Sequence, residues 1–307
     1  MSSINTNTAA MTALKSLQAT NSALETTQSR ISTGLAVNDA SDNAAYWSIA
    51  TTMRSDNKAL GTVNDALGLG AAKVDVAYTG MNSAIEVVDE IKSKLVAARE
   101  PGVDKSKVQS EISELQNQLT SIATSASFSG ENWLSQDSSA AGYSATKEVV
   151  ASFNRSASGA VSVGTVDINT ATTKLFDANA GATGILDLNF TTTGTAAVTA
   201  NVSSLDISGA TIDSDDIDDM ITAVDSAITK MTTAAADLGA SKGRIDMQKD
   251  FVGNLMDAID RGVGTLVDAD MTKESTRLSA LQTQQQLGAQ ALSIANGSAQ
   301  SILGLFR

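Results

Sequence analysis

The side chains that most enzymes use for chemistry are missing from this sequence or stand far apart. The 307 residues include no cysteine and no histidine, which removes thiolate nucleophiles, Cys/His zinc sites and the commonest general base. Asp39 and Asp42 lie close together in sequence, but two carboxylates in a turn are a weak signal for a metal ion. We recognise no nucleophile–base set, phosphate loop or metal cluster, and we therefore expect no catalytic, cofactor or metal site.

Composition also limits the partners that the chain is expected to bind. The net charge of −13 argues against nucleic acid, whose phosphates need clustered Lys and Arg, and against an anionic membrane surface. No apolar stretch is long enough to span a bilayer. The first residues lack the basic and apolar sections of a cleaved secretory signal. We expect either a cytoplasmic protein or one exported by a route that needs no such signal.

Two long segments carry an apolar residue at every seventh position, the spacing of helices that pack along one another. The first is Met53, Leu60, Leu67, Val74, Met81, Val88 and Leu95, and the second is Ile217, Val224, Met231, Leu238, Ile245, Val252, Ile259 and Leu266. Lys242 and Lys249 interrupt the companion seam of the second segment, either reaching solvent or pairing with acids of a neighbour. Glycines weaken a helix, so we predict breaks at Gly80 or at Gly262 and Gly264.

A shorter helix is predicted next to the first long one. Val108, Ile112, Leu115, Leu119 and Ile122 have helical spacing. The only proline, Pro101, precedes a glycine and turns the chain. Residues 81–99 and 106–123 should form an antiparallel hairpin that the helix at 217–266 completes as a bundle. Trp133, in the loop that follows, is expected to belong to the local core.

The centre of the chain, residues 137–216, differs in kind. It is rich in Ser, Thr, Ala, Gly and Asn and holds three basic residues. Apolar alternation predicts strands at 161–168, 186–190 and 202–207. We interpret this part as a small β-rich insertion, with a flexible surface linker as the alternative.

The chain ends are predicted to form amphipathic helices. Near the end of the chain there are two apolar seams, so that such a helix can pack against more than one neighbour. Leu17, Leu24 and Ile31 form a heptad seam near the start. Near the end, Leu278 and Leu292 belong to one seam and Leu287 and Ile294 to another. Such helices are marginal alone in water. They pack either against other copies, in an open filament, or against the protein's own core, and spacing alone favours neither.

Both ends of the chain carry distinctive sequence motifs. They are Arg30-Ile31-Ser32-Thr33-Gly34-Leu35-Ala36-Val37-Asn38-Asp39-Ala40-Ser41-Asp42-Asn43-Ala44-Ala45, Asp268-Ala269-Asp270, Gln284-Gln285-Gln286-Leu287-Gly288 and Ile302-Leu303-Gly304-Leu305-Phe306-Arg307. These motifs resemble those at the two ends of bacterial flagellins. The run Tyr46-Trp47-Ser48-Ile49-Ala50 is similar to flagellins of the alphaproteobacterial, rhizobial type. A hook–filament junction protein is the alternative that shares these end motifs.

The resemblance implies a secreted structural subunit of the flagellar filament for swimming motility, exported by the flagellar type III apparatus. It implies partners in copies of itself, paralogous flagellins, an export chaperone, and the cap and hook-junction proteins. The subunit-interface residues that follow are Leu14, Leu17, Leu24, Arg30, Ile31, Leu35, Asn38, Asp39, Asp42, Asn43, Leu278, Leu287, Leu292, Ile294, Ile302, Leu305 and Phe306.

The expected fold is mainly α: a long antiparallel coiled-coil bundle from both chain ends with a small β-rich central insertion. Three domains are expected. Residues 1–40 and 270–307 form an inner tube, residues 41–136 and 217–269 form the helical bundle, and residues 137–216 face solvent as the variable domain.

Overall fold

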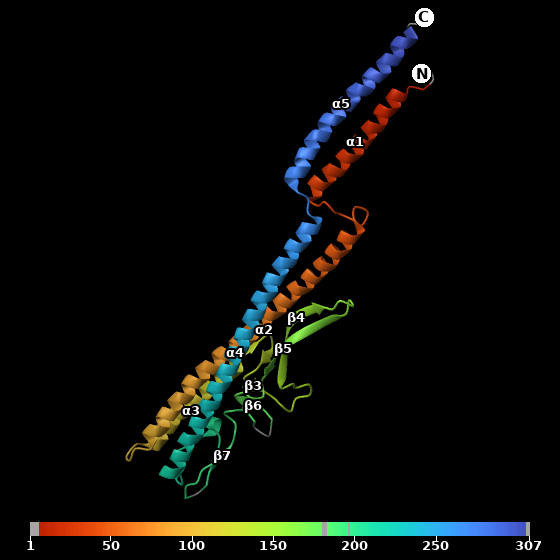
Figure 1. Cartoon of the computed structure of the whole chain (residues 1–307). Helices are drawn as coiled ribbons and strands as arrows, with labels where there is room; N and C mark the ends of the chain where they lie inside the picture. The colour runs from red at the N-terminus through yellow and green to blue at the C-terminus, as the bar shows by residue number, and fades with distance from the viewer. Residues whose placement is uncertain (1–5, 180–182, 196, 305–307) are drawn as a thin grey trace. The chain divides into compact units, whose positions relative to one another are not determined.

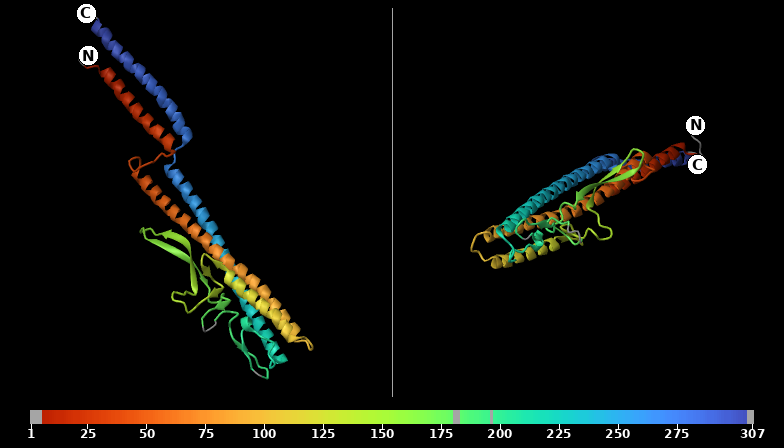
Figure 2. Two further views of the ribbon diagram at one scale, coloured as in Figure 1. Left: turned by 180° about the vertical axis from the view of Figure 1, so that it is seen from behind. Right: turned by 90° about the horizontal axis from the view of Figure 1, so that it is seen from below.

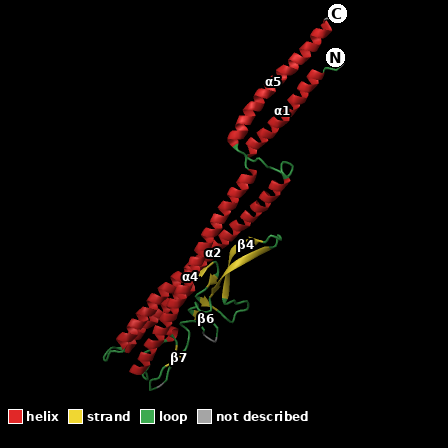
Figure 3. Cartoon of the chain, in the orientation of Figure 1, coloured by secondary structure: helices red, strands yellow, loops and turns green. Residues whose placement is uncertain are grey.

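The computed structural model describes residues 6–179, 183–195 and 197–304, with the backbone alone from residue 298 onwards. Helices form both ends of the chain, and the strands lie between the third and fourth helices in sequence (Figures 1 and 3). The chain divides into two compact units, Met1–Lys58 with Met256–Arg307, and Ala59–Leu255. The expectation of a mainly helical protein with a small strand-containing centre is confirmed.

In the first unit, helix α1 (Thr8–Thr33) lies antiparallel to helix α5 (Met271–Gly304), and the two run side by side in Figure 1 and in the left view of Figure 2. Asn7 caps α1, because its side chain accepts a hydrogen bond from the Ala10 N–H at 3.0 Å. α1 ends at Gly34, whose φ of 72° is the left-handed conformation that terminates many helices. At the start of α5, Asp270 accepts from the Thr272 N–H at 3.0 Å.

Helices α2 (Ala44–Ala98) and α4 (Ser214–Val267) carry the two predicted heptad seams. Every seam residue is buried except Met53, Ile259 and Leu266, which are half-buried. In the second unit the helices are antiparallel, as three ion pairs show: Lys242 with Asp75, Lys92 with Asp225, and Arg99 with Asp218. From one ion pair to the next, the residue number rises on α2 by as much as it falls on α4. The two helices therefore keep one register over this length.

The predicted breaks at Gly80 and at Gly262 and Gly264 are wrong, because α2 and α4 continue through them. Gly80 is a packing position instead. A Cβ there would stand 2.8 Å from Leu134 Cδ1 and 3.0 Å from Ala126 Cβ. The missing side chain lets the segment after the third helix approach α2, and the packing outweighs the weak helix propensity of glycine.

The predicted hairpin is confirmed. Helix α3 (Lys105–Ser125) begins at Asp104, which accepts from the Ser106 N–H at 3.1 Å. It buries Ile112 and Leu119. Lys94 of α2 pairs with Glu111 of α3 at 2.8 Å.

Four two-stranded sheets make up the strand-containing part of the described chain. β1 (Ser127–Phe128) pairs with β2 (Glu131–Asn132), and β3 (Ser135–Gln136) pairs in parallel with β6 (Phe176–Asp177). β4 (Thr146–Arg155) and β5 (Val161–Asn169) form the long antiparallel hairpin, with a register irregularity between Val150 and Ser152. β7 (Phe190–Thr191) pairs with β8 (Thr199–Ala200), and a short helix η1 (Val202–Ser204) follows.

The strand predicted at 161–168 is confirmed as β5, whereas those predicted at 186–190 and 202–207 are wrong except for Phe190. Leu186, Val202, Leu205 and Ile207 are nevertheless buried. Side-chain amides of α3 take the place of a neighbouring strand. Gln116 donates to the Val202 and Leu205 carbonyls at 3.1 Å, and Gln109 Oε1 accepts from the Ile207 N–H at 2.9 Å.

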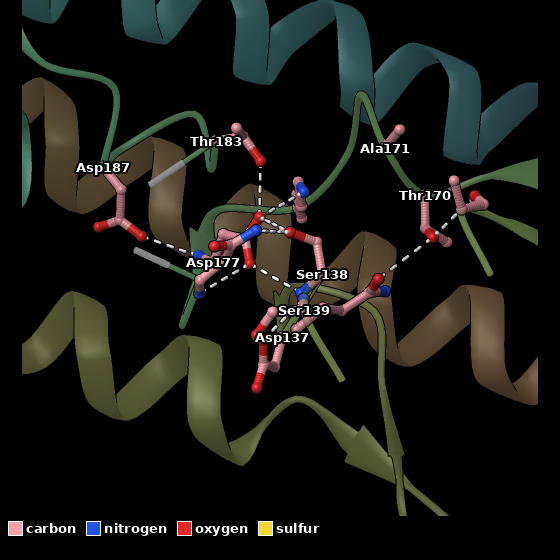
Figure 4. A network of polar contacts seen from close by, with 12 residues as sticks. Asp137, Ser138, Ser139, Thr170, Ala171, Asp177, Thr183 and Asp187 are labelled. Atoms are coloured by element: carbon pink, nitrogen blue, oxygen red, sulfur yellow. Dashed lines mark hydrogen bonds and ion pairs between the residues drawn. The ribbon is translucent and has the colours of Figure 1, made fainter. Parts of the chain in front are cut away.

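A buried polar network holds the insertion together (Figure 4). The Asp177 carboxylate accepts from Lys174 Nζ at 2.6 Å, from the Thr183 hydroxyl at 2.6 Å and from the Ser138 N–H at 2.9 Å. The Asp177 N–H donates to Asp187 at 2.8 Å. These bonds join both sides of the β3–β6 pair, so the insertion is a packed structure and not a linker.

Candidate assembly surface

One face of α1 packs on α5. Asn7 Nδ2 donates to the Ala295 carbonyl at 2.9 Å, Gln285 Nε2 donates to Asn21 at 2.8 Å, and Arg30 pairs with Glu274 at 3.4 Å. Thr27, Glu274 and Leu281 are buried in this contact. The pair is therefore held by contacts along its length.

The predicted interface residues of α1 and α5 fall into two groups. Leu17, Leu24, Ile31, Leu278 and Leu292 are half-buried on the stripes by which the helices meet. Leu14, Leu287 and Ile294 are exposed, the last two by 58% and 73%. The first seam of α5 is thus occupied by α1, while the second has no cover within the described part of the chain.

Three predicted interface residues lie near the end of the chain. The side chain of Ile302 is not described, and Leu305 and Phe306 lie outside the described residues.

The turn between α1 and α2 is anchored at one end. Leu35 forms an antiparallel bridge with Asp268, and the Ala36 N–H donates to the Val267 carbonyl at 2.7 Å. Val37 is buried in a cluster with Ala50, Val263 and Val267. The backbone entering this turn is therefore fixed against the end of α4.

The polar residues of the turn satisfy its own backbone. Asp42 accepts from the Asn38 N–H at 3.0 Å, and Asp39 accepts from the Ser41 N–H at 2.8 Å. Hydrogen bonds from Ser41 hold the pKa of Asp39 below its usual value. Asn43 caps α2 through the Ala45 N–H at 3.1 Å. The outer surfaces of Asn38, Asp39 and Asp42 are exposed.

No group of three His, Cys, Asp or Glu side chains that could hold a metal ion occurs within the described ranges. No helix that the structure describes is both long and apolar enough to cross a membrane.

Three further residues of this surface were not predicted from the sequence as parts of it. Met11 is 61% exposed on α1, and Glu274 is buried although charged. Gly288 lies against Leu17, since a Cβ there would be 3.2 Å from Leu17 Cδ1. The alternation of three and four residues from Glu274 to Gly288 could have identified the face of α5 that meets α1.

The described structure therefore combines two long terminal helices that pair with each other and an apolar seam of α5 that stays exposed. The family profile described as "Bacterial flagellin N-terminal helical region" matches residues 4–139, and "Bacterial flagellin C-terminal helical region" matches residues 221–306. The chain belongs to the bacterial flagellin family.

Relatives match over the whole length. Flagellin C of Rhizobium meliloti (strain 1021) is 57% identical and Flagellin A of that strain 48% identical, each with 100% of both chains covered. A flagellin of Brucella melitensis is 48% identical, again over 100% of both chains. The crystal structure of Bacillus cereus flagellin has a TM-score of 0.40 and 20% identity, covering 62% of this chain and 88% of that chain.

These matches confirm the predicted rhizobial type and make the chain a structural subunit of the bacterial flagellar filament, which lies outside the cell. They connect it to self-polymerisation and to paralogous flagellins. Nothing among them favours the hook–filament junction protein.

Proposed function

We propose that this flagellin polymerises through the outward faces of α1 and α5. The observation that carries the proposal is the second seam of α5, where Leu287 and Ile294 are 58% and 73% exposed. α1 has only Lys15 as a charged residue from Thr8 to Leu24, and α5 has none from Leu278 to Gly304. Copies of a chain with a net charge of −13 repel each other, so they approach with least repulsion where charge is absent.

The free energy for association comes from burying these side chains. A Leu or Ile taken fully out of water contributes roughly 1.5–3 kcal/mol. Ordering the helices and immobilising the subunit oppose this gain. A few such side chains per contact give a weak interface, which becomes stable when each subunit contacts several neighbours in a filament.

The remaining interface residues complete the proposed surface. Leu35, Asn38, Asp39, Asp42 and Asn43 contact a neighbouring subunit from the turn, and Arg30 does so from the last turn of α1. Ile302, Leu305 and Phe306 belong to the same proposed interface. The turn suits this role because its backbone is anchored at Val267, so that exposed polar groups are presented without a large loss of entropy on binding.

Within the filament we propose three layers. Residues 1–40 and 270–307 form the inner tube, residues 41–136 and 217–269 the surrounding bundle, and residues 137–216 the solvent-facing part. The subunit passes through the flagellar type III apparatus, accompanied by an export chaperone, and is added beneath the cap on a hook-junction protein. Its role is mechanical, with no catalytic step.

Two polar substitutions test the assembly surface. In the full chain, Leu287→Gln with Ile294→Gln should abolish filaments and leave the monomer folded, as measured by sedimentation and circular dichroism. Leu188→Gln is the matched control, since Leu188 is 49% exposed in the insertion and should polymerise normally.

Deleting residues 278–307 should likewise leave a soluble, folded monomer. Normal filaments from the double glutamine variant or from this truncation would refute the proposal.

A further inference from the structure

A groove runs between α1 and α5. Its volume is about 530 Å³. Small side chains line it: Ala9, Thr12, Ala13, Ser16, Gly288, Ala291 and Ala295. An engineered apolar cavity of about 150 Å³ accepts a benzene-sized group, so this groove has room for two large aliphatic side chains.

Two large aliphatic side chains project from α1, on residues of the segment that also lines the groove. Met11 is 61% exposed and Leu14 is 45% exposed. Successive residues of an α-helix are rotated by about 100°, so Leu14 lies roughly 140–160° around α1 from Ala9, Thr12 and Ser16. The ridge formed by Met11 and Leu14 therefore projects from the side of α1 away from the groove. Because ridge and groove both lie between residues 9 and 16 of α1, they stand at the same level along the pair.

We infer that the Met11–Leu14 ridge of one copy inserts into the α1–α5 groove of the next copy. This inference rests on the proposed polymerisation through α1 and α5 and specifies which faces meet. The contact is heterologous, because different surfaces of the two copies touch, and such contacts leave a free ridge and a free groove at the two ends of any open row. Side-by-side addition with little axial displacement follows from their common level.

The groove edges and their charges suit this occupant. Leu287, Ala291 and Ile294 are three and four residues apart on α5, so Leu287 and Ile294 flank the groove wall that Ala291 contributes. None of the described side chains that line the groove is charged. Lys15, the one charged residue between Thr8 and Leu24, has a stem long enough to keep its ammonium in water. An apolar ridge from another copy can thus be buried without desolvating a charge.

Cross-linking in the full chain tests the contact directly, because the natural sequence has no cysteine. Filaments of Met11→Cys/Ala291→Cys are assembled under reducing conditions, oxidised, and separated on a denaturing gel without reductant. We expect a ladder of covalent oligomers. The matched control is Met11→Cys/Ala289→Cys: Ala289 is exposed on the same helix but lies about 160° around it from Ala291, and it should give monomers.

Filling the groove gives a second measurement that needs no cysteine. Ala291→Leu should raise the critical concentration for polymerisation roughly tenfold or more, since added bulk in a packed contact is destabilising. Ala289→Leu should leave it unchanged. Adding Leu14→Ala to Ala291→Leu should recover part of the loss, because the ridge shrinks as the groove fills.

The two proposals fail in different ways. Normal filaments with equal cross-linking in both cysteine variants, or no effect of Ala291→Leu, would overturn the ridge-and-groove contact and leave polymerisation through α1 and α5 standing. Normal filaments from Leu287→Gln/Ile294→Gln would overturn both.

Discussion

At the scale of single residues, the buried charges are stabilised by specific partners. Lys174 and Asp177 have side chains that are 5% and 0% exposed. Burial raises the pKa of Asp177, but hydrogen bonds from Lys174, Thr183 and Ser138 outweigh it and hold that pKa well below the usual value. The carboxylate is therefore ionised in the folded protein, and Lys174, Thr183 and Ser138 all donate their hydrogen bonds to a charged acceptor.

Asp177→Asn should destabilise the insertion strongly. Removing one member of a buried pair leaves the Lys174 ammonium without its counter-charge, which costs about 3–5 kcal/mol. Urea unfolding followed by the fluorescence of the buried Trp133 measures the loss. Asp167→Asn, at an exposed strand position, should change the free energy of unfolding by less than about 0.5 kcal/mol.

A cycle with Lys174→Met isolates the pair. The Lys174→Met/Asp177→Asn chain should lose less stability than the two single variants together, because no unpaired charge remains. Additive losses would contradict an interaction between the two side chains.

Individual residues were predictable where their role followed from helical spacing. Heptad spacing placed Leu17, Leu292, Leu287 and Ile294 on apolar seams; the first two are half-buried and the last two exposed, while their role between subunits stays a prediction. Trp133, expected in the local core, is confirmed as buried. Lys242 pairs with Asp75, while Lys249 is exposed. The network around Asp177 was not foreseen, because its partners are spread from Ser138 to Asp187 and only the fold brings them together.

At the scale of elements, glycine in a long helix has two different roles. Gly68 and Gly70 both lie within α2. A Cβ at Gly68 would meet nothing within 4 Å, whereas a Cβ at Gly70 would overlap the side chain of Val149 on β4. Gly70 therefore lets the long hairpin lie against α2, and Gly68 has no such contact.

The two glycines should respond to alanine with opposite signs. Gly68→Ala should stabilise the second unit by up to about 1 kcal/mol, the gain in helix propensity. Gly70→Ala makes the same gain but forces Val149 and β4 away, a cost of about 1–3 kcal/mol for overpacking. Thermal unfolding of the two variants measures the difference. Equal stabilisation by both would show that the hairpin does not rest on α2.

Helices were predicted better than strands for a physical reason. A heptad repeat over many turns specifies both the helix and its buried stripe, as α2 and α4 show. Apolar alternation near Leu186 and Leu205 specifies that these side chains are buried but does not specify a strand. Any group that hydrogen-bonds to the backbone of such a segment can replace a neighbouring strand. Here the partners are Gln109 and Gln116 of α3, which sequence patterns do not connect to the insertion. The helix breaks predicted at Gly80, Gly262 and Gly264 were wrong, because that prediction considered the low helix propensity of glycine and left out tertiary packing.

At the scale of the whole molecule, charge and apolar surface are separated along the chain. The net charge is −13, yet most of α1 and nearly all of α5 are uncharged. The surfaces proposed to associate therefore belong to subunits that repel one another at long range. Salt screens exposed charges and leaves buried apolar contacts intact.

Polymerisation should accordingly be easier at higher ionic strength. Raising the salt from about 0.01 M to about 0.15 M shortens the Debye length from roughly 30 Å to roughly 8 Å. The critical concentration, measured by sedimentation, should fall. Replacing exposed acids of the insertion with their amides should lower it at low salt and have little effect at high salt. A critical concentration that rises with salt would show that ion pairs between subunits dominate association.

Stability should depend on pH only outside the neutral range. The chain has no histidine and no cysteine, so no side chain with an ordinary pKa titrates between about pH 5.5 and 7. The unfolding midpoint should be flat there. Hydrogen bonds from neighbouring Ser or Thr residues lower the pKa values of Asp104, Asp137 and Asp219, and that of Asp177 is lowered by its network.

A carboxyl whose pKa is lower in the folded state than in the unfolded state binds its proton later as pH falls. The unfolded chain therefore takes up more protons, and the stability present above about pH 4 is lost progressively below it. The advantage of the natural chain over Asp177→Asn should shrink over the same interval, because the unfolded natural chain binds a proton at Asp177 that the folded chain excludes, and asparagine binds none. Urea unfolding of both chains between pH 7 and pH 2 tests this. A midpoint transition near neutral pH, or a gap between the two chains that is unchanged down to pH 2, would mean that the ionised Asp177 network does not stabilise the fold.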